Sequence, residues 1–506
     1  MQRKQLTLVI VSLLVVVLSV SLAWFTTQII GKGKDVSVTS ANLQIVFTDS
    51  DGSISGSNIE PGWSATKTFT VQNNSKSEYK YNIVIKDLLN TFVTNGYLKY
   101  KITSTNDGYN MTEFKDIPKS SVATDTILAY SVVIPDGVTQ SYTIEFKYTN
   151  DESVDQSDDM GKKLSGTLFI TEGTEQPTLL SQILNDNPTR KTRDTYTDVF
   201  TNNTTGTLFT ATEKNVHNIA DTTVYYYAGN TTNNWVKFAG YYWRIIRTNA
   251  DGSIRMLYSG TSHDTTSGYL STPAIKFVFN TSYNSPKYVG YMYGKNDDTL
   301  VNARTNTNNS TIKTAIDNWY ASNMTSYTKY LSTTAVYCND RTEKTSGTYN
   351  TGSADFDYAP YARVWSTYSP TYDCTEASDA FSGSNTSAKL TYPIALMTSD
   401  EIMRAGGKGG TSLTSPYAWY YLNSANGSIT GSTWWWLLSP SNWNVSRAYM
   451  FLVCGSLGPG YLDNYYVVNN TNGVRPAISL KSCVKTSGGD GSANAPYTIK
   501  ETETGC

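Results

Sequence analysis

Few residues of this chain have types and spacing suited to acid–base chemistry. Its 506 residues include only two histidines, His217 and His263. A centre with several His ligands, or a reaction with several His-based proton transfers, would be difficult to build from two. The adjacent carboxylates of Asp400 and Glu401 fit a helix start better, because Thr398 stands three residues before Glu401 and completes a capping box. We therefore expect a protein that is not an enzyme.

The run Asp49-Ser50-Asp51-Gly52 holds clustered carboxylates, which are ligands for hard cations such as calcium. An EF-hand loop places its Gly at the sixth position, with acids at the first, third and fifth. Here Gly52 directly follows Asp51, as it does in a hairpin turn. We interpret the run as a turn and expect neither a metal nor a cofactor.

The richest set of contact residues lies near the C-terminus, in segment 441–472. Its side chains are mainly Tyr, Trp, Asn, Ser and Gly, and Arg447 and Asp463 carry its only charges. Such mixtures form adaptable binding surfaces, because aromatics give area at low rotamer cost and small polar groups give hydrogen bonds. The predicted ligand-binding residues are Asn442, Trp443, Asn444, Ser446, Arg447, Tyr449, Tyr461, Asp463, Asn464, Tyr465, Tyr466, Asn469 and Asn470. Ordinary strands and turns remain the alternative interpretation of the same residues.

The charge balance argues against a nucleic-acid partner. The chain has 40 Lys and Arg against 42 Asp and Glu, and only 16% of its residues are charged. Electrostatic binding to phosphates needs a concentrated Lys/Arg surface. We expect instead an extracellular protein or glycan as the ligand.

The N-terminal segment 1–34 has the features of an export signal. A basic start at Arg3 and Lys4 precedes an uncharged stretch that is long enough to span a bilayer. The run from Ser21 to Thr26 resembles the signal ends of Gram-positive biofilm-matrix and camelysin-type proteins, which implies cleavage near Ala23. The protein is then expected to be extracellular or on the cell surface, and the helix would hold it in the membrane if the signal stays uncleaved.

Residues 35–171 have the period-two pattern of half-buried strands. Tyr142, Ile144, Phe146 and Tyr148 alternate with polar residues, and turn signals such as Pro135-Asp136-Gly137 separate the strands. This spacing predicts an all-β sandwich of the jelly-roll or immunoglobulin-like kind. The domain also resembles the camelysin and matrix-fibre family, through motifs such as 41–43, 60–62, 69–73 and 166–168. That resemblance implies a module capable of self-assembly.

A short polar linker at 172–177 leads into the C-terminal domain, 178–506. We expect a short helix at 178–185, a polar and partly irregular stretch up to about Thr223, and a hairpin at 242–258. An amphipathic helix is expected at 310–323. The strand of Trp434 to Trp436 is expected to end at Pro440. Arg475 lies among apolar residues, so its guanidinium must be hydrogen-bonded if it is buried.

This domain resembles the C-type-lectin-like modules of Gram-positive gut bacterial surface proteins. The resemblance rests on the motifs at 389–394, 396–401, 434–440 and 473–480 and extends from about Tyr225 to Thr498. It implies an α+β fold that is shared with formylglycine-generating enzymes and with the variable proteins of diversity-generating retroelements. In the latter proteins, the diversified segment lies where 441–472 lies here.

Five cysteines in an exported chain predict two disulfides and one remaining thiol. Spacing alone cannot choose among the pairings. We favour Cys338 with Cys374 and Cys483 with Cys506, which leaves Cys454 inside the recognition segment.

The function expected from these features is that of an exported surface adhesin or receptor with a ligand-binding C-terminal head. Two alternatives stay open. The first is a structural subunit of a biofilm matrix or surface fibre, built on the β-sandwich. The second is an enzyme of the formylglycine-generating type, which is disfavoured because those enzymes use a pair of closely placed cysteines that is missing around Cys454.

Overall fold

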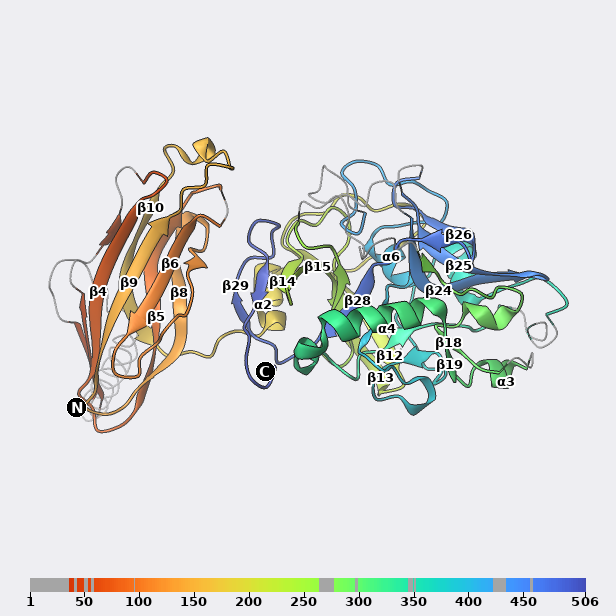
Figure 1. The fold of residues 1–506 in the computed structure, drawn as a ribbon, viewed down its shortest axis with the longest axis horizontal. Helices are drawn as coiled ribbons and strands as arrows, with labels where there is room; N and C mark the ends of the chain where they lie inside the picture. The colour runs from red at the N-terminus through yellow and green to blue at the C-terminus, as the bar shows by residue number, and fades with distance from the viewer. Residues whose placement is uncertain are drawn as a thin grey trace, which may run out of the picture. The chain divides into compact units, whose positions relative to one another are not determined.

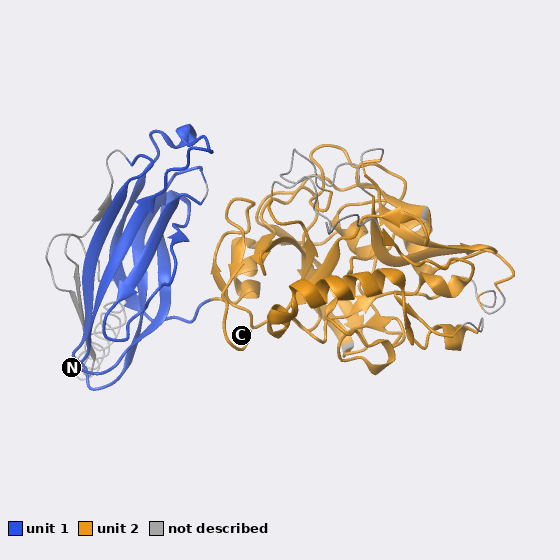
Figure 2. Cartoon of the chain, in the orientation of Figure 1, with its two compact units in different colours: residues 1–176 blue, residues 177–506 orange. Residues whose placement is uncertain are grey.

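The chain forms two compact units, Met1–Gln176 and Pro177–Cys506 (Figure 2). The computed structural model describes residues 36–40, 43–49, 53–55, 59–94, 96–263, 277–295, 299–344, 349, 352–421, 434–455 and 458–506. Strands dominate the regular structure of both units (Figure 1). The predicted signal or anchor helix at 1–34 lies outside these residues, as do positions 50–52 of the predicted turn. Within the described ranges, no helix is long and apolar enough to cross a membrane.

Unit 1 is built from two antiparallel sheets. One sheet has the order β1, β2, β4, β9, β6, β7, and the other has the order β3, β10, β5, β8. The strands are β1 (Val36–Ser40), β2 (Leu43–Asp49), β3 (Ser53–Ser55), β4 (Ser64–Asn73), β5 (Tyr79–Asn90), β6 (Leu98–Ser104), β7 (Lys115–Asp116), β8 (Ser120–Ile134), β9 (Thr139–Tyr148) and β10 (Leu164–Glu172).

The two sheets share one hydrophobic core. Buried and half-buried residues alternate along all of β9, as the period of the sequence predicts. The Tyr81 hydroxyl on β5 lies 2.5 Å from that of Tyr142 on β9 and donates to Gln140 Oε1 at 2.7 Å, which links the two sheets. In the predicted Pro135-Asp136-Gly137 turn, Gly137 has φ +69°, a conformation that favours glycine. The predicted all-β character of this unit is confirmed.

Unit 2 contains a branched ten-stranded sheet. Its main path runs β11, β12, β13, β15, β14, β30, β29, and a branch from β15 continues through β16 and β28 to β23. The strands are β11 (Thr189–Lys191), β12 (Thr207–Asn215), β13 (Asn218–Tyr226), β14 (Trp235–Phe238), β15 (Tyr241–Thr248), β16 (Ile254–Tyr258), β23 (Ile394–Leu396), β28 (Pro476–Leu480), β29 (Thr486–Gly488) and β30 (Tyr497–Ile499). The predicted hairpin at 242–258 is the pair β15 and β16.

A four-stranded sheet with the order β21, β24, β25, β26 carries the predicted recognition segment. Its strands are β21 (Phe356–Asp357), β24 (Trp435–Asn444), β25 (Arg447–Val453) and β26 (Leu462–Val467). Three small two-stranded sheets pair β17 (Phe277–Val278) with β27 (Thr471–Asn472), β18 (Met292–Tyr293) with β19 (Asn308–Asn309), and β20 (Tyr337–Cys338) with β22 (Ala380–Phe381).

Among the α-helices described in unit 2, all but α5 begin at a side-chain cap. The helices are α2 (Leu179–Asp186), α3 (Leu300–Ala303), α4 (Thr311–Asn323), α5 (Ala359–Ala362) and α6 (Ser399–Ala405). Thr178, Ser310 and Thr398 accept backbone amides at the starts of α2, α4 and α6. The predicted helices at 178–185 and 310–323 are confirmed to within a residue, and so is the capping box of Thr398 and Glu401.

The stretch before Thr223 is irregular only in part, because β12 and most of β13 lie in it as an antiparallel pair. Five threonines stand in these two strands, and their β-branched side chains suit strands although the stretch is polar. The expected end of the Trp434 strand at Pro440 was wrong, because β24 continues through Pro440, where its pairing with β25 shifts register on both sides. A proline is tolerated at such an irregularity because no ladder hydrogen bond is needed from its nitrogen.

A buried ion cluster joins α6 to the large sheet. Glu401 Oε1 accepts from Arg247 Nε at 2.9 Å and from Arg255 Nη1 at 2.7 Å, and Arg247 also pairs with Glu213 at 2.7 Å. All four side chains are at most 3% exposed. Burial acts to raise the pKa of Glu401, but Arg255, Arg247 and the Thr398 amide outweigh it, so the pKa is lowered below its ordinary 4.5.

Replacing Glu401 by Gln is expected to destabilise unit 2 by about 3 kcal/mol or more, because the Arg255 guanidinium then stays buried without its counter-charge. Urea unfolding followed by circular dichroism measures the loss. The matched control is Glu376→Gln at an exposed position, which should unfold like the unchanged protein. Equal unfolding midpoints for the two variants would contradict the role given to Glu401.

The stability of unit 2 should also depend on pH through Glu401. Since the pKa of Glu401 is lowered in the folded state, its ionised form contributes fully to the free energy of unfolding above pH 4.5, and this contribution is lost as the pH falls below that value.

Candidate functional site

Strands β24, β25 and β26 lie side by side and form a rigid base for the predicted recognition segment (Figure 1). Every residue of β25 from Ala448 to Val453 is buried. Trp435 and Trp436 on β24 are also buried, and the Trp436 indole donates to the Phe277 carbonyl at 2.7 Å. The buried residues of β24 and β25 leave ligand contacts from these two strands to their ends and connections.

The structure divides the predicted recognition residues by exposure. Trp443 and Tyr449 are buried, at 3% and 2% exposure. The half-buried members are Asn442, Asn444, Tyr461, Asp463, Asn464 and Tyr466, the exposed members are Ser446, Arg447, Asn469 and Asn470, and the backbone of Tyr465 lies in β26. The Trp443 indole donates to the Gly352 carbonyl at 3.1 Å. We assign Trp443 and Tyr449 to the framework, because buried aromatic rings offer no area to a ligand.

The exposed residues and the half-buried Asn444 gather at one end of the sheet, which we call the tip surface: Asn444, Ser446, Arg447, Asn469 and Asn470. Asn444 pairs with Arg447 across the β24–β25 hairpin. The β26–β27 turn reaches the same end, since the Val468 amide donates to the Ala448 carbonyl at 3.0 Å and Ala448 follows Arg447 in β25. The tip surface therefore combines one cation, three amides and a hydroxyl.

Framework contacts hold the tip surface in place. Asn444 Nδ2 donates to the Tyr449 hydroxyl at 2.9 Å, and the Ser446 hydroxyl donates to Asn444 Oδ1 at 3.3 Å. Tyr449 is therefore a positioning residue, because its hydroxyl holds the Asn444 side chain in place.

Two exposed apolar side chains next to the tip surface were missed by sequence reasoning. Val445, between Asn444 and Ser446, is 56% exposed, and Tyr283 is 39% exposed. The Tyr283 carbonyl accepts the Ala448 amide at 2.9 Å, so this ring is anchored beside the hairpin. Nothing near Tyr283 in the sequence indicates this, because a contact across 165 positions depends on the tertiary fold.

A second group of predicted residues lies along the strands. Cys454 Sγ lies 3.7 Å from Asp463 Oδ2, and the ring centroids of Tyr466 and Trp434 lie 4.6 Å apart. Asp463 is opposite Leu452, five residues beyond Arg447 in β25, which is about 17 Å along a strand. The predicted residues thus form two separate groups, and only the tip surface is largely exposed.

The Cys454 thiol is poorly suited to nucleophilic chemistry. It is 1% exposed. Burial raises its pKa to about 12, and the negative charge of Asp463 adds to the rise. A thiol with this pKa stays protonated at neutral pH, and the thiolate is the reactive form.

Arg475 is an anchor within the domain, as the sequence indicates. Its side chain is fully buried, Nε donates to the Tyr258 carbonyl at 3.1 Å, and Nη1 donates to the Tyr420 carbonyl at 2.7 Å. The guanidinium also lies 4.9 Å from the centre of the Trp435 ring. It ties β16 and the segment around Tyr420 to β28.

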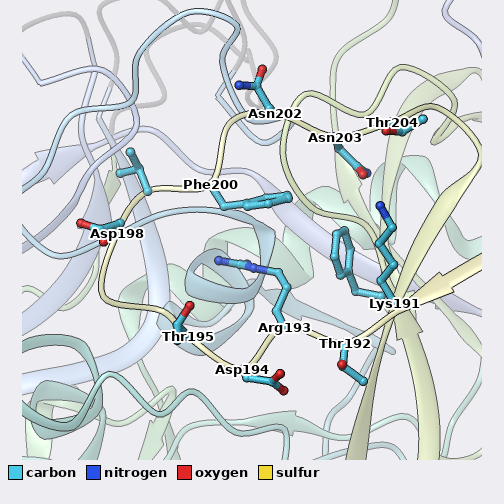
Figure 3. Close-up of a pocket in the computed structure, with 12 residues that line it drawn as sticks. Lys191, Thr192, Arg193, Asp194, Thr195, Asp198, Phe200, Asn202, Asn203 and Thr204 are labelled. Atoms are coloured by element: carbon cyan, nitrogen blue, oxygen red, sulfur yellow. The ribbon is translucent and has the colours of Figure 1, made fainter.

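A groove of about 700 Å³ lies elsewhere in unit 2, along residues 191–209 (Figure 3). The Arg193 guanidinium lies 4.6 Å from the ring centres of Tyr196 and Phe200 and donates to the carbonyls of Met403 and Arg404. These contacts engage the Arg193 guanidinium within the protein. The groove therefore has a surface of charged and polar side chains, with Lys191 and Asp198 at its edges. The sequence does not predict this groove, because the polar residues that line it follow neither a helical nor a strand period.

Both predicted disulfides are present. Cys338 is joined to Cys374 and Cys483 to Cys506, with Cα atoms 5.7 Å and 5.4 Å apart. Cys454 is the free cysteine. Among the residues for which the structure gives positions, no group of three His, Cys, Asp or Glu side chains could hold a metal ion. The carboxylates of Asp400 and Glu401 are both engaged by arginines, Asp400 by Arg363 at 2.6 Å.

No family model and no curated protein matches the chain. A solved structure that matches in part is that of AvmM, which is described as catalysing macrocyclization in alchivemycin A biosynthesis. It is 11% identical, and the alignment covers 29% of this chain and all of that one with a TM-score of 0.15. We draw no conclusion about fold or activity from a TM-score this low.

The Cys454 thiol is expected to resist alkylation by iodoacetamide at pH 8 in the native, non-reduced protein and to react fully in guanidinium chloride, because burial and the raised pKa remove access and thiolate together. Mass spectrometry counts the added groups. An Asp463→Asn variant removes the adjacent charge and tests the electrostatic part separately. Rapid labelling of the native protein would contradict this assignment.

Proposed function

We propose that the protein is an exported cell-surface adhesin or receptor that binds an extracellular protein or glycan through the tip surface of unit 2. The observation that carries this proposal is the exposure of Ser446, Arg447, Asn469 and Asn470 at the end of a sheet whose strands are otherwise mostly buried. Such a site is pre-organised, since its backbone is fixed before the ligand arrives, and this lowers the entropic cost of binding.

Two disulfides support an extracellular location. Disulfides persist in oxidising compartments and are rare where thiols are kept reduced. Export would use the segment 1–34, which also provides a membrane contact if it is retained.

The segments that resemble C-type-lectin-like modules lie together in unit 2, which supports a C-type-lectin-like fold for the head. Strand β23 pairs with β28 through Ile394 and Ile478, and Trp435 forms a bridge with Gly473. The Leu438 amide donates to the Met397 carbonyl at 2.8 Å. These contacts frame the segment 441–472 on both sides, as expected for a variable binding segment set in a constant framework, and retroelement diversification of this segment forms part of the proposal.

Replacing Arg447 and Asn470 together by Ala is expected to weaken ligand binding by about tenfold or more, because the change removes the only cation and one amide of the tip surface. Arrays of extracellular-matrix proteins and glycans identify the ligand, and surface plasmon resonance measures the affinity. The control is Lys191→Ala, which removes a cation at the separate groove of Figure 3. Unchanged affinity in the double variant would contradict the proposed site.

One observation favours a second function for unit 1, which is self-assembly into fibres. Among the strands that the structure describes, β8 is an edge strand of 15 residues that pairs only with β5, and Val122 on it is 71% exposed. A long edge strand with apolar side chains is a template for pairing with another chain.

If β8 mediates assembly, Val122→Lys should shift assemblies of the protein toward monomers, since a charged edge strand resists pairing. Multi-angle light scattering over a range of concentrations measures the mass. Val154→Lys, another exposed valine of unit 1 that lies outside the sheets, serves as the matched control. A monomeric unchanged protein, or equal masses for the two variants, would argue against fibre formation through β8.

A further inference from the structure

Helix α4 has an unusual distribution of charge. Its only two charged residues, Lys313 and Asp317, form an ion pair at 2.6 Å, and their side chains are 0% and 12% exposed. The exposed face carries Thr314, Asn318 and Ser322 instead. A surface helix normally turns its charged residues toward water and its less polar residues toward the core.

This neutral face forms one wall of a groove of about 610 Å³, a volume typical of small-molecule sites. Strand β17 and the segments around Tyr293 and Asn309 form the remaining walls. The groove is lined by Phe277, Asn280, Thr281, Tyr293, Asn309, Thr311, Thr314, Ala315, Asn318, Trp319, Ser322 and Asn323. These lining residues are aromatic rings, amides and hydroxyls, and none of them is charged.

One polar group at the groove, the Asn280 amide nitrogen, is buried with no acceptor in good hydrogen-bond geometry among the described residues. Asn280 is 3% exposed, and its Oδ1 accepts from the Thr311 hydroxyl at 3.4 Å. Burial raises the pKa of Tyr293 and the neighbouring Asn280 amide opposes the rise, yet Asn280 Nδ2 has no acceptor in hydrogen-bond geometry among the described residues. A ligand oxygen at this place would give the buried amide an acceptor in good hydrogen-bond geometry.

The aromatic wall is held rigidly. The Trp319 ring centre lies 5.5 Å from that of Tyr241 and 5.7 Å from that of Tyr258. The Tyr241 hydroxyl also donates to Asn323 Oδ1 at 3.0 Å, at the end of the groove. The buried Trp319 ring therefore supports the wall, and the half-buried rings of Phe277 and Tyr293 give the groove its apolar area.

We propose that this groove binds a neutral oligosaccharide. Sugar hydroxyls both donate and accept hydrogen bonds and match the amides and hydroxyls of the walls, while the C–H faces of the rings match the aromatic side chains. A phosphate or carboxylate ligand would need an arginine or lysine, which the lining does not contain. A purely apolar ligand would leave the amides unpaired.

The groove is separate from the tip surface and shares no side chain with it. The two are joined through the backbone, because Phe277 of β17 pairs with Asn472 of β27, two residues after Asn470. The head therefore has a neutral site beside a charged one, and each can be tested by itself.

The test uses a printed array of neutral, sialylated and sulfated oligosaccharides with the full-length protein, followed by calorimetric titration of the strongest neutral glycan. Asn318→Lys places a long charged side chain in the groove and should weaken binding by about tenfold or more. Ala321→Lys adds the same charge to an exposed position of α4 that does not line the groove, and it should leave the affinity within about twofold. Asn280→Ala removes the unpartnered amide and should also weaken binding.

We expect the protein to bind a neutral glycan with an affinity that changes little with salt concentration, since no charges take part. The Arg447→Ala variant should bind this glycan as well as the unchanged protein. The proposal is overturned if the array shows no neutral glycan bound, or if Asn318→Lys and Ala321→Lys bind equally well. Loss of binding in Arg447→Ala alone would place the glycan at the tip surface and would also overturn it. Circular dichroism of each variant confirms that the fold is kept.

Discussion

The structure of unit 2 depends on one buried carboxylate. Glu401 caps its own helix through the Thr398 amide and at the same time accepts hydrogen bonds from Arg247 and Arg255 on two neighbouring strands. Arg247 extends the cluster to Glu213 on β12. A buried charge is tolerated only when it is paired and hydrogen-bonded, so α6 and strands β12, β15 and β16 can take only the arrangement that satisfies all four charges.

This arrangement explains why the adjacent carboxylates are structural. Arg363 holds Asp400 through Nε at 2.6 Å and pairs with Asp340 at 2.8 Å. Both carboxylates at the start of α6 are therefore engaged in ion pairs and hydrogen bonds to the framework.

In the function that we propose, recognition by unit 2 depends on hydrogen bonds and aromatic area more than on long-range attraction. The tip surface presents amides, a hydroxyl and Arg447 beside Tyr283, and the α4 groove presents amides and hydroxyls beside the half-buried rings of Phe277 and Tyr293. In both places a tyrosine holds a polar side chain of the surface, since Tyr449 bonds Asn444 and Tyr241 bonds Asn323. The rigidity of the framework thus compensates for weak electrostatic steering.

The sequence by itself determined the local features. The period-two strands, the caps at Thr178, Ser310 and Thr398 and the buried role of Arg475 depend on neighbouring residues, whose types and spacing are visible in the chain; both disulfide pairs were also anticipated. Only the tertiary structure decided which contact residues face outward. Register and twist place Trp443 and Tyr449 inside and bring Tyr283 to the hairpin. The tertiary structure also decided that the two charged residues of α4 are buried. Their spacing in the sequence is as compatible with an ion pair on a solvated face as with a buried one.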